Sequence, residues 1–457
     1  MSRHGSIRAF VLLCSILLLF LAPSASGATK KIILDPAAEP SWQVAVNGIA
    51  SRSSDAATDV IMTSGGVAWV AGAVEDQSGN HDLSLTKIVN GVRKWTKTYD
   101  AYGGPDAARQ LAVGPGGVVY TVGLSYKSGA VGLLLVKWSP GGAILWKRRY
   151  DIAAALITGT GVVVDKAGNV TVCGYESWLM SSTGKWVMRS YTPGGALRWK
   201  WLYAPGSGGT AVPEDICVAG DGSVYATGYL DNSGVQTAMT VRVSAAGKKL
   251  WMKTYRGPDG LGATTSAIVR CPSGGVYVCG QVQTSAHNQD GLVMRYAPNG
   301  ARRVFALDTA GGGTHNERFN DLTVTSTKKI IAVGSSSVSG TYDCRSVTYR
   351  SDGTLAVALT FPGTNGGGFT CVAADSMGGF VAGGYWWTSA TNCELCAVRG
   401  STLTGGGWWA TLFPNPVAST AGRATAIAAR GNVVVVVGEY ESTVTSDSDQ
   451  IVLGFVY

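Results

Sequence analysis

The sequence predicts an all-β protein, an eight-bladed β-propeller with four antiparallel strands in each blade. The first observation is a strand-like apolar run that ends in glycine and recurs every 50 to 54 residues. The eight glycines are Gly72, Gly123, Gly174, Gly228, Gly280, Gly334, Gly384 and Gly438. An internal period of this length is typical of a ring of blades. The second observation is that each period holds strand-length apolar runs separated by turn residues, which indicates hairpins.

The second repeat shows the predicted blade most clearly. Residues 111–114 form a short apolar strand and 118–123 return as a second strand, with a Pro-Gly-Gly turn between them. Residues 133–137 predict the third strand and 144–150 the fourth. Glycine recurs in the turns because these turns need positive φ. The five valines of 433–437 predict a second strand that is buried on both faces.

The ends of the chain predict how the ring closes. A Trp-x-Lys-x-Tyr pattern marks the fourth strand, for example at Trp95–Tyr99, but the chain stops after the third strand of the eighth repeat, 451–457. The missing pattern stands at the start, where Trp42 precedes Trp95 by 53 residues. We therefore expect Trp42–Val46 to complete the last blade as its outermost strand, which removes both exposed sheet edges.

Domain organisation follows from the ends of this repeat. Residues 1–27 predict a signal peptide, with a basic start, an apolar run and small residues before the cleavage site. Residues 28–40 form a linker, and 41–457 form a single propeller domain of eight repeats. The sequence therefore predicts a secreted or cell-surface protein that is a monomer and has no integral membrane segment after cleavage.

Composition excludes some partners. The formal net charge is +8, only 14% of residues are charged, and no run of Lys or Arg occurs. Nucleic-acid binding needs clustered positive charge, so no nucleic-acid partner is expected. The partners that remain are a glycan, a cell-wall polymer or a protein.

The runs GLLLVKWSPGGAILWKRRYD (132–151) and VVVDKAGNVTVCGYE (162–176) resemble bacterial extracellular β-propeller repeats of the SBBP type. They are more distantly similar to pyrroloquinoline-quinone-type propeller repeats, which share a turn glycine followed by Trp. The resemblance covers about 41–457 and implies a secreted bacterial propeller, usually without an assigned activity. No quinone-site or metal-site residue matches, so no cofactor and no metal are expected.

Residues that recur in every repeat are expected to be structural. One set is a basic position on the third strand, where the stem of the side chain covers apolar surface. This set comprises Lys87, Lys137, Arg189, Arg242 and Arg295. The recurrent Trp residues are expected to pack on the outer strands.

Binding residues are expected where the repeat breaks, on the face that carries the longer loops. Aromatic residues with a polar tip suit stacking on sugars or peptides, although packing on neighbouring loops is the alternative. The candidates are Trp178, Tyr385, Trp386, Trp387 and Tyr440.

A second group of candidates stands near the start of the first strands, at the predicted channel mouth. They are Asp59, Arg109, Glu214, Asp215, Arg318, Asn320 and Asp321. Paired carboxylates there could support acid/base chemistry, as in glycosidases. The alternative is that they cap backbone amides, and no residue is assigned as catalytic.

Nine cysteines occur, and Cys14 lies in the predicted signal peptide. In an oxidising compartment the others suggest disulfides, of which Cys271 with Cys279 would bridge one hairpin. Cys393-Glu-Leu-Cys396 has the spacing of a redox or zinc motif, but a disulfide, with Cys344 as a partner, suits its β context better.

These features predict a binding or interaction module that acts through its loop-rich face. One alternative is a carbohydrate-active hydrolase or lyase that uses the channel-mouth carboxylates. The other is a non-catalytic scaffold for protein assembly.

Overall fold

The computed structural model describes residues 40–46, 54–153, 155–178, 183–206, 208–232, 234–285, 288–308, 316–337, 341–361, 365–390, 392–400, 409–413, 420–442 and 448–456. The predicted signal peptide and nearly all of the predicted linker lie outside these residues. The described part consists of β-strands and one short 3-10 turn, η1 (Pro115–Gly117). No helix within it is long and apolar enough to cross a membrane.

The strands form antiparallel units of four, numbered here in chain order. Unit 1 holds β2 (Ala56–Thr63), β3 (Val67–Glu75), β4 (His81–Val89) and β5 (Val92–Tyr99). Unit 2 holds β6 (Asp106–Val113), β7 (Val119–Lys127), β8 (Ala130–Trp138) and β9 (Ile144–Tyr150). Unit 3 holds β10 (Ala155–Val164), β11 (Val170–Trp178), β12 (Gly184–Tyr191) and β13 (Leu197–Tyr203). Unit 4 holds β14 (Gly209–Val218), β15 (Val224–Asn232), β16 (Val235–Val243) and β17 (Lys249–Tyr255).

The second half repeats this order. Unit 5 holds β18 (Ala263–Arg270), β19 (Val276–Ser285), β20 (Asn288–Tyr296) and β21 (Arg302–Asp308). Unit 6 holds β22 (Asn316–Val324), β23 (Ile330–Ser337), β24 (Tyr342–Tyr349) and β25 (Leu355–Phe361). Unit 7 holds β26 (Gly367–Ala374), β27 (Phe380–Trp387), β28 (Cys393–Gly400) and β29 (Trp409–Phe413). Unit 8 holds β30 (Thr420–Arg430), β31 (Val433–Ser442), β32 (Ser448–Val456) and, from the other end of the chain, β1 (Trp42–Val46).

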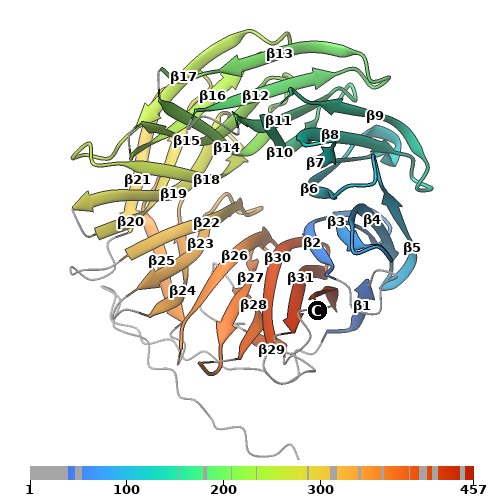
Figure 1. Ribbon diagram of the computed structural model, residues 1–457. Helices are drawn as coiled ribbons and strands as arrows, with labels where there is room; N and C mark the ends of the chain where they lie inside the picture. Colours follow the sequence, from blue (N-terminus) through green and yellow to red (C-terminus); the bar gives the residue numbers. More distant parts are fainter. Residues whose placement is uncertain are drawn as a thin grey trace, which may run out of the picture.

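Burial follows the position of a strand within its unit. The second strands are buried almost throughout, as β3 and β23 show, because both faces of each sheet are covered by neighbouring units. The fourth strands, such as β13, alternate between exposed and half-buried residues. Figure 1 shows the first strand of each unit toward the common centre and the fourth strand at the periphery.

The turn glycines have the conformation that the sequence predicts. In the turn between β6 and β7, Gly116 and Gly117 both have φ of 74°. In unit 6 the corresponding turn has no glycine, and Lys328 takes the left-handed conformation with φ of 61°. This strain is the cost of a turn without glycine.

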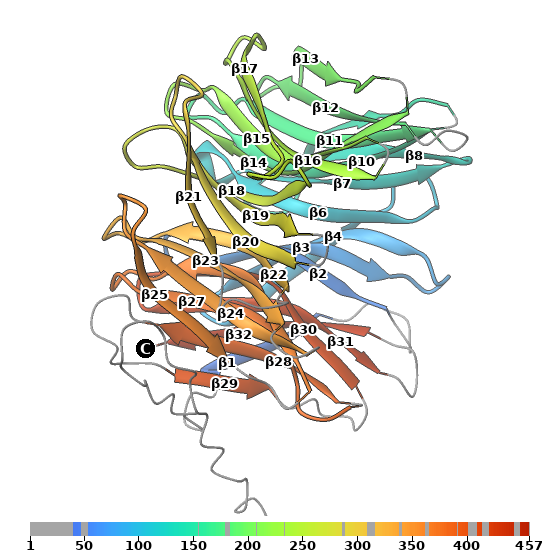
Figure 2. The same cartoon turned by 90° about the vertical axis from the view of Figure 1, so that its left-hand side faces the viewer.

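The predicted pairing of Trp42–Val46 with the C-terminal strand is confirmed. β1 pairs antiparallel with β32, with Trp42 opposite Gly454 and Val46 opposite Gln450. Figure 2 shows the two strands side by side although they come from opposite ends of the chain. The ring of Trp42 also covers Gly91 in the turn between β4 and β5, where a Cβ would lie 2.5 Å from its Cγ. The fourth strand of unit 8 therefore touches unit 1.

Neighbouring units are also joined near the start of their first strands. Cys393 of β28 forms a parallel bridge with Ala421 of β30, between units 7 and 8. Ser448 of β32 forms the same kind of bridge with Ser54, just before β2, between units 8 and 1. We call the end of the units where first strands begin the loop end, and the opposite end the turn end.

Every unit carries a β-bulge between its first and second strands. One residue of the first strand has no partner in the ladder, at Thr58, Arg109, Thr160, Glu214, Ser266, Asn320, Thr370 and Thr425. A bulge interrupts the ladder and leaves backbone groups that need other partners. Sequence reasoning did not predict this feature, and it explains most of the polar residues near the axis.

Candidate functional site

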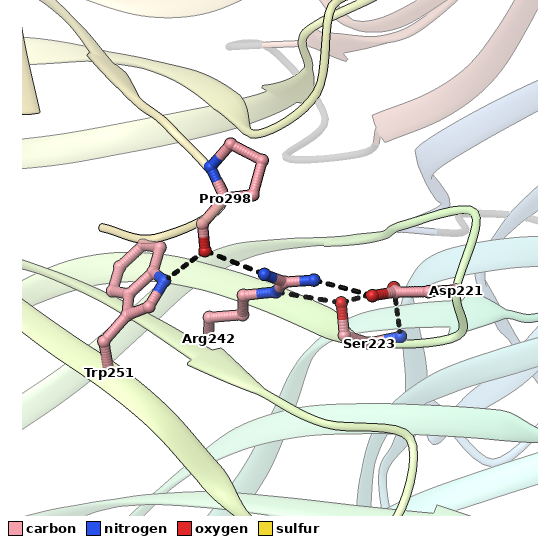
Figure 3. A network of polar contacts seen from close by, with 5 residues as sticks. All are labelled: Asp221, Ser223, Arg242, Trp251 and Pro298. Atoms are coloured by element: carbon pink, nitrogen blue, oxygen red, sulfur yellow. Dashed lines mark hydrogen bonds and ion pairs between the residues drawn. The ribbon is translucent and has the colours of Figure 1, made fainter. Parts of the chain in front are cut away.

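At the turn end, a cation and a tryptophan share one carbonyl of the next unit. Figure 3 shows Arg242 Nη1 donating to Pro298 O at 2.7 Å, while Trp251 Nε1 donates to the same oxygen at 2.9 Å. Arg242 also bonds Asp221 Oδ2 at 2.6 Å and Ser223 Oγ at 3.0 Å. Through these contacts, two side chains of unit 4 hydrogen-bond the turn carbonyl of unit 5. We call this contact between units the polar joint.

The same joint recurs in earlier units. Lys137 Nζ and Trp146 Nε1 donate to Pro193 O at 2.7 and 2.9 Å, and Lys87 Nζ donates to Pro140 O at 3.0 Å. Arg189 instead lies over the ring of Tyr150, 4.1 Å from its centroid, and Arg295 Nη2 donates to Ser273 Oγ at 2.9 Å. The structure thus gives the recurrent basic and Trp positions the structural role that the sequence predicts.

The three aspartates predicted at the channel mouth bind backbone amides beside the bulges. Asp59 accepts from Val60 N at 2.8 Å and, in unit 2, from Leu111 N at 2.9 Å. Asp215 repeats this arrangement between units 4 and 5, where its second acceptor contact is with Ile268 N at 2.9 Å. Asp321 repeats it between units 6 and 7, bonding Val372 N at 2.8 Å. Each carboxylate therefore uses both oxygens to join two units.

These aspartates also interact with one another across the axis. Burial raises the pKa of Asp59 and of Asp321 to about 7, while their amide bonds act in the opposite direction. The charge of Asp215 adds to the rise at both sites, and its own pKa is raised by burial.

The bulge residues provide further contacts between units. Asn320 Nδ2 donates to Phe369 O at 2.7 Å, and Thr370 Oγ1 donates to Ala424 O at 2.6 Å. Thr425 Oγ1 donates to Ala57 O at 2.6 Å, which joins unit 8 to unit 1. Asn320, predicted as a channel-mouth residue, is thus part of this interunit set.

Arg109 and Glu214 are the remaining pair of predicted mouth residues in the first half. Both are bulge residues, in units 2 and 4, and Arg109 is exposed. Burial raises the pKa of Glu214, and the charge of Arg109 counteracts this rise.

Four of the five aromatic candidates are half-buried packing residues at the loop end. Trp178 packs against the cluster between units 2 and 3, and Lys185 Nζ lies 5.5 Å from its ring centroid. Trp386 packs against the cluster between units 6 and 7, and Trp387 N donates to Gly366 O at 2.9 Å. Tyr440 packs on Leu395 and Gly422. These contacts agree with the packing alternative.

Tyr385 differs from these four because two arginines lie beside it. Its ring covers Gly368, where a Cβ would lie 3.0 Å from the hydroxyl oxygen. Burial raises the pKa of the Tyr385 hydroxyl, and the charges of Arg423 and Arg318 counteract this rise from units 8 and 6. Both arginine side chains are exposed.

One register position at the loop end varies from unit to unit. It pairs the first-strand residue two positions before each bulge residue with its partner on the second strand, and we call these two residues a loop-end pair. They are Ala56/Ala73, Ala107/Leu124, Thr158/Tyr175, Val212/Tyr229, Thr264/Gln281, Arg318/Ser335, Gly368/Tyr385 and Arg423/Glu439. The pairs are apolar in units 1 and 2 and are polar or charged in units 5 to 8.

A small hollow lies beside the loop-end pair of unit 5. It has a volume of about 60 Å³ and is lined by Gln236, Thr264, Gln281, Gln283 and Gln289, with Leu261 at its edge. Side-chain amides both donate and accept hydrogen bonds, which suits hydroxyl-rich ligands. The hollow therefore lies at the same end of the molecule as Arg318, Tyr385 and Arg423, which belong to units 6, 7 and 8.

The cysteines of the described residues are all free thiols, so the predicted bridge from Cys271 to Cys279 is not formed. Cys271 Sγ lies 3.1 Å from Ser273 Oγ, and the register places Cys279 opposite Ala267 instead. The suggested partner of the Cys393–Cys396 segment is in place, because the buried thiols of Cys344 and Cys396 are in hydrogen-bond contact. No group of His, Cys, Asp or Glu in the described part could hold a metal ion.

Sequence reasoning missed Arg423 and the glutamines of unit 5. Counting back from the repeat glycine would have found Arg423, because it stands opposite the residue after Gly438, as Arg318 stands opposite the residue after Gly334. The turn of unit 8 is shorter than the others, which hides this correspondence in the linear sequence. No sequence pattern within a single repeat indicates the bulge.

Comparison with known proteins shows the fold. No family model and no curated protein matches the chain. A crystal structure of Sqt1 from Chaetomium thermophilum matches with a TM-score of 0.54 and 10% identity, over 91% of this chain and 100% of that chain. A second Sqt1 structure gives 0.51 and 11%, over 88% and 95%. The polysaccharide lyase Uly1 gives 0.47 and 10%, over 81% and 93%. The two Sqt1 structures are of a β-propeller-like protein, and from this likeness and the strand order we conclude that the chain has an all-β fold of the propeller type.

Proposed function

We propose that the eight units are the blades of one closed propeller that works outside the cytoplasm. Three contacts between units 8 and 1 support closure: the Ser54–Ser448 bridge, the Thr425–Ala57 hydrogen bond and the cover of Gly91 by Trp42. The first two match contacts found between units 7 and 8. Export rests on the predicted signal peptide at 1–27.

We further propose that this propeller is a glycan-binding module that recognises its ligand at the loop end of units 5 to 8. The observation that carries the proposal is the change in the loop-end pairs, from apolar in units 1 and 2 to Thr264/Gln281, Arg318 and Arg423 in units 5, 6 and 8. A second-strand tyrosine recurs at this position in units 3, 4 and 7, and in unit 7 it is Tyr385, between the two arginines. The scaffold does not require these side chains, because other units fold with alanine there. A half-buried tyrosine ring, with amides and cations on neighbouring units at the same end, suits sugar rings and their hydroxyl groups.

The hydrolase or lyase alternative depends on the channel-mouth carboxylates Asp59, Glu214, Asp215 and Asp321. The three aspartates among them accept hydrogen bonds from backbone amides of the neighbouring units. Their substitution would weaken the ring before it changed any chemistry. The geometry therefore favours binding over catalysis at this position.

The test uses the purified full chain and a panel of soluble polysaccharides and cell-wall polymers. We expect at least one member to bind, and we expect Tyr385→Ala and Gln281→Ala each to lower its affinity at least fivefold. Tyr126→Ala is the matched control, because Tyr126 is an exposed tyrosine at the loop end of unit 2. If no member of the panel binds, or if the control loses as much affinity, the proposal is wrong.

A further inference from the structure

Three consecutive first strands bring an arginine, a tyrosine and an arginine to one register position. Arg318 of β22 stands opposite Ser335, Gly368 of β26 stands opposite Tyr385, and Arg423 of β30 stands opposite Glu439. In unit 7 the first strand has glycine where its neighbours have arginine, so the space above Gly368 is filled by the Tyr385 ring. Units 6, 7 and 8 thus place Arg318, Tyr385 and Arg423 one after another around the axis.

Both arginines are available to a ligand. Their side chains are exposed, and neither guanidinium forms an ion pair within the residues that the structure describes. This contrasts with Arg242 and Arg399, whose guanidinium groups are bound by Asp221 and Asp375. Two unpaired guanidinium groups on either side of one ring attract anions more strongly than a single exposed arginine does.

Glu439 is the cross-strand partner of Arg423. The other loop-end pairs contain no Asp and no Glu. The loop-end pairs of units 6 to 8 therefore hold two arginines and one glutamate.

The spacing of the three groups indicates a chain ligand rather than a single small ion. The two charges come from units 6 and 8 and are separated by the whole of unit 7, with an aromatic ring between them. A chain of acidic sugars presents charges at intervals with a sugar ring between them. The amide-lined hollow of unit 5 continues the same sector with groups that bind hydroxyls.

We propose that the loop end of units 6 to 8 binds an anionic polysaccharide, with Arg318 and Arg423 on its acid groups and Tyr385 against the sugar between them. This inference rests on the proposed glycan-binding function and names its ligand class. Guanidinium groups bind carboxylates and sulfates by the same bidentate geometry, so the site suits a uronate and a sulfate ester alike.

The experiment measures binding of the purified full chain to polygalacturonate, to dextran sulfate and to neutral dextran by titration calorimetry. We expect binding to at least one of the two acidic polymers and at least tenfold weaker binding to neutral dextran. The acidic polymer that binds more tightly identifies the acid group as carboxylate or sulfate. Affinity should fall with rising salt concentration.

Variants locate the site. We expect Arg318→Gln and Arg423→Gln each to lower the affinity for the acidic polymer at least fivefold, and the double variant to abolish the preference over neutral dextran. Arg430→Gln is the matched control, because Arg430 is an exposed arginine on the same strand, β30, at its turn end. Thermal unfolding of each variant checks that the fold is retained.

The outcomes separate this inference from the proposed function. Binding to neutral glycans in the wider panel without binding to either acidic polymer would overturn the inference and leave the proposed function standing. Loss of affinity in Arg430→Gln equal to that in Arg423→Gln would also overturn it, because the attraction would then be unspecific. Absence of binding to every glycan would overturn both.

Discussion

The joints between the early units differ from the joint between units 6 and 7. In unit 4, Arg242 and Trp251 are register partners and both bind the turn carbonyl of the next unit. In unit 6 the same register holds Thr348 and Val357. Units 6 and 7 are instead joined by an apolar cluster that includes Phe361, Phe369, Cys344 and Cys396.

The difference coincides with a change at the loop end. Units 1 and 2, with polar joints of the repeated kind, have apolar loop-end pairs, whereas unit 6 lacks the Arg/Trp register pair and carries Arg318 at its loop end. Unit 7 keeps Arg399 opposite Trp409, and Asp375 binds Arg399 as Asp221 binds Arg242. Local departures from a repeated pattern are expected where a protein has acquired a function. The comparison teaches that the repeat degenerates at both ends of unit 6.

The largest expected effect tests the apolar joint. Oxidation should link Cys344 and Cys396: each thiol loses its proton, one S–S bond forms, and two electrons reduce glutathione disulfide to two thiols. Closing this loop should raise the unfolding free energy by about 4 kcal/mol. Peptide mass mapping after refolding in a glutathione buffer checks the link, and Cys279 should stay a thiol. If both cysteines remain open to alkylation after denaturation, units 6 and 7 have no covalent joint.

The next effect tests the polar joint. Trp251→Ala removes the bond to Pro298 O and the contacts with the rings of Tyr225 and Tyr296, whose centroids lie 5.7 and 5.6 Å away. We expect the unfolding free energy to fall by about 3 kcal/mol, measured by denaturant titration. Leu250→Ala, at a neighbouring residue that is 47% exposed, should cost far less. Equal losses would show that the Trp position is not a joint.

A smaller effect concerns the aspartates that both regions share. The pKa values of Asp59 and Asp321 are raised to about 7 in the folded state, above their usual 3.8. A raised folded-state pKa stabilises the fold at low pH, and this stabilisation is lost as the pH rises from about 4 through 7. We expect a loss on the order of 2 kcal/mol per carboxyl, about half the full linkage value because both side chains keep some contact with water.

Unfolding curves at pH 5 and pH 8 check this dependence. Wild type should be less stable at pH 8, and Asp59→Asn and Asp321→Asn should each remove part of the difference. An Asp151→Asn control, at an exposed residue of the turn after β9, should retain it. A wild type that gains stability between pH 5 and pH 8 would contradict the raised pKa values.

The smallest effect concerns the charge of the polar joint. Arg242→Met keeps the apolar stem and removes the bonds to Pro298, Ser223 and Asp221. Because Asp221 is well exposed, we expect a loss of only about 1 kcal/mol. Arg430→Met serves as the control in the same denaturant titration. If Arg242→Met and Arg430→Met lose the same stability, Arg242 does not contribute to the polar joint and only Trp251 does.

The sequence was sufficient for the strands and their order because the glycine period and the Trp-x-Lys-x-Tyr pattern reflect local turns and packing. It also predicted that β1 would pair with β32, since the missing fourth strand could only come from the other end. The bulges were not predictable, because they follow from how first strands crowd around the axis. For the same reason Asp59, Asp215 and Asp321 could be assigned to amide capping or to catalysis only once both of their acceptor contacts were visible.

The candidate site was predicted in part. Arg318 was predicted and is exposed, whereas Tyr385, Trp386 and Trp387 are all half-buried. Burial therefore does not separate Tyr385 from the two tryptophans, but the charges of Arg318 and Arg423 from the neighbouring units do.

The pairing of β1 with β32 has a consequence for the time course of folding. The first strand of the domain to be synthesised waits for the last, so Trp42 cannot meet Gly454 until nearly the entire chain is present. Contacts between residues so far apart in sequence form late, and they slow folding. Interactions that form after the transition state chiefly slow unfolding. The pairing of β1 with β32 should therefore contribute little to the rate of folding and much to the lifetime of the folded state.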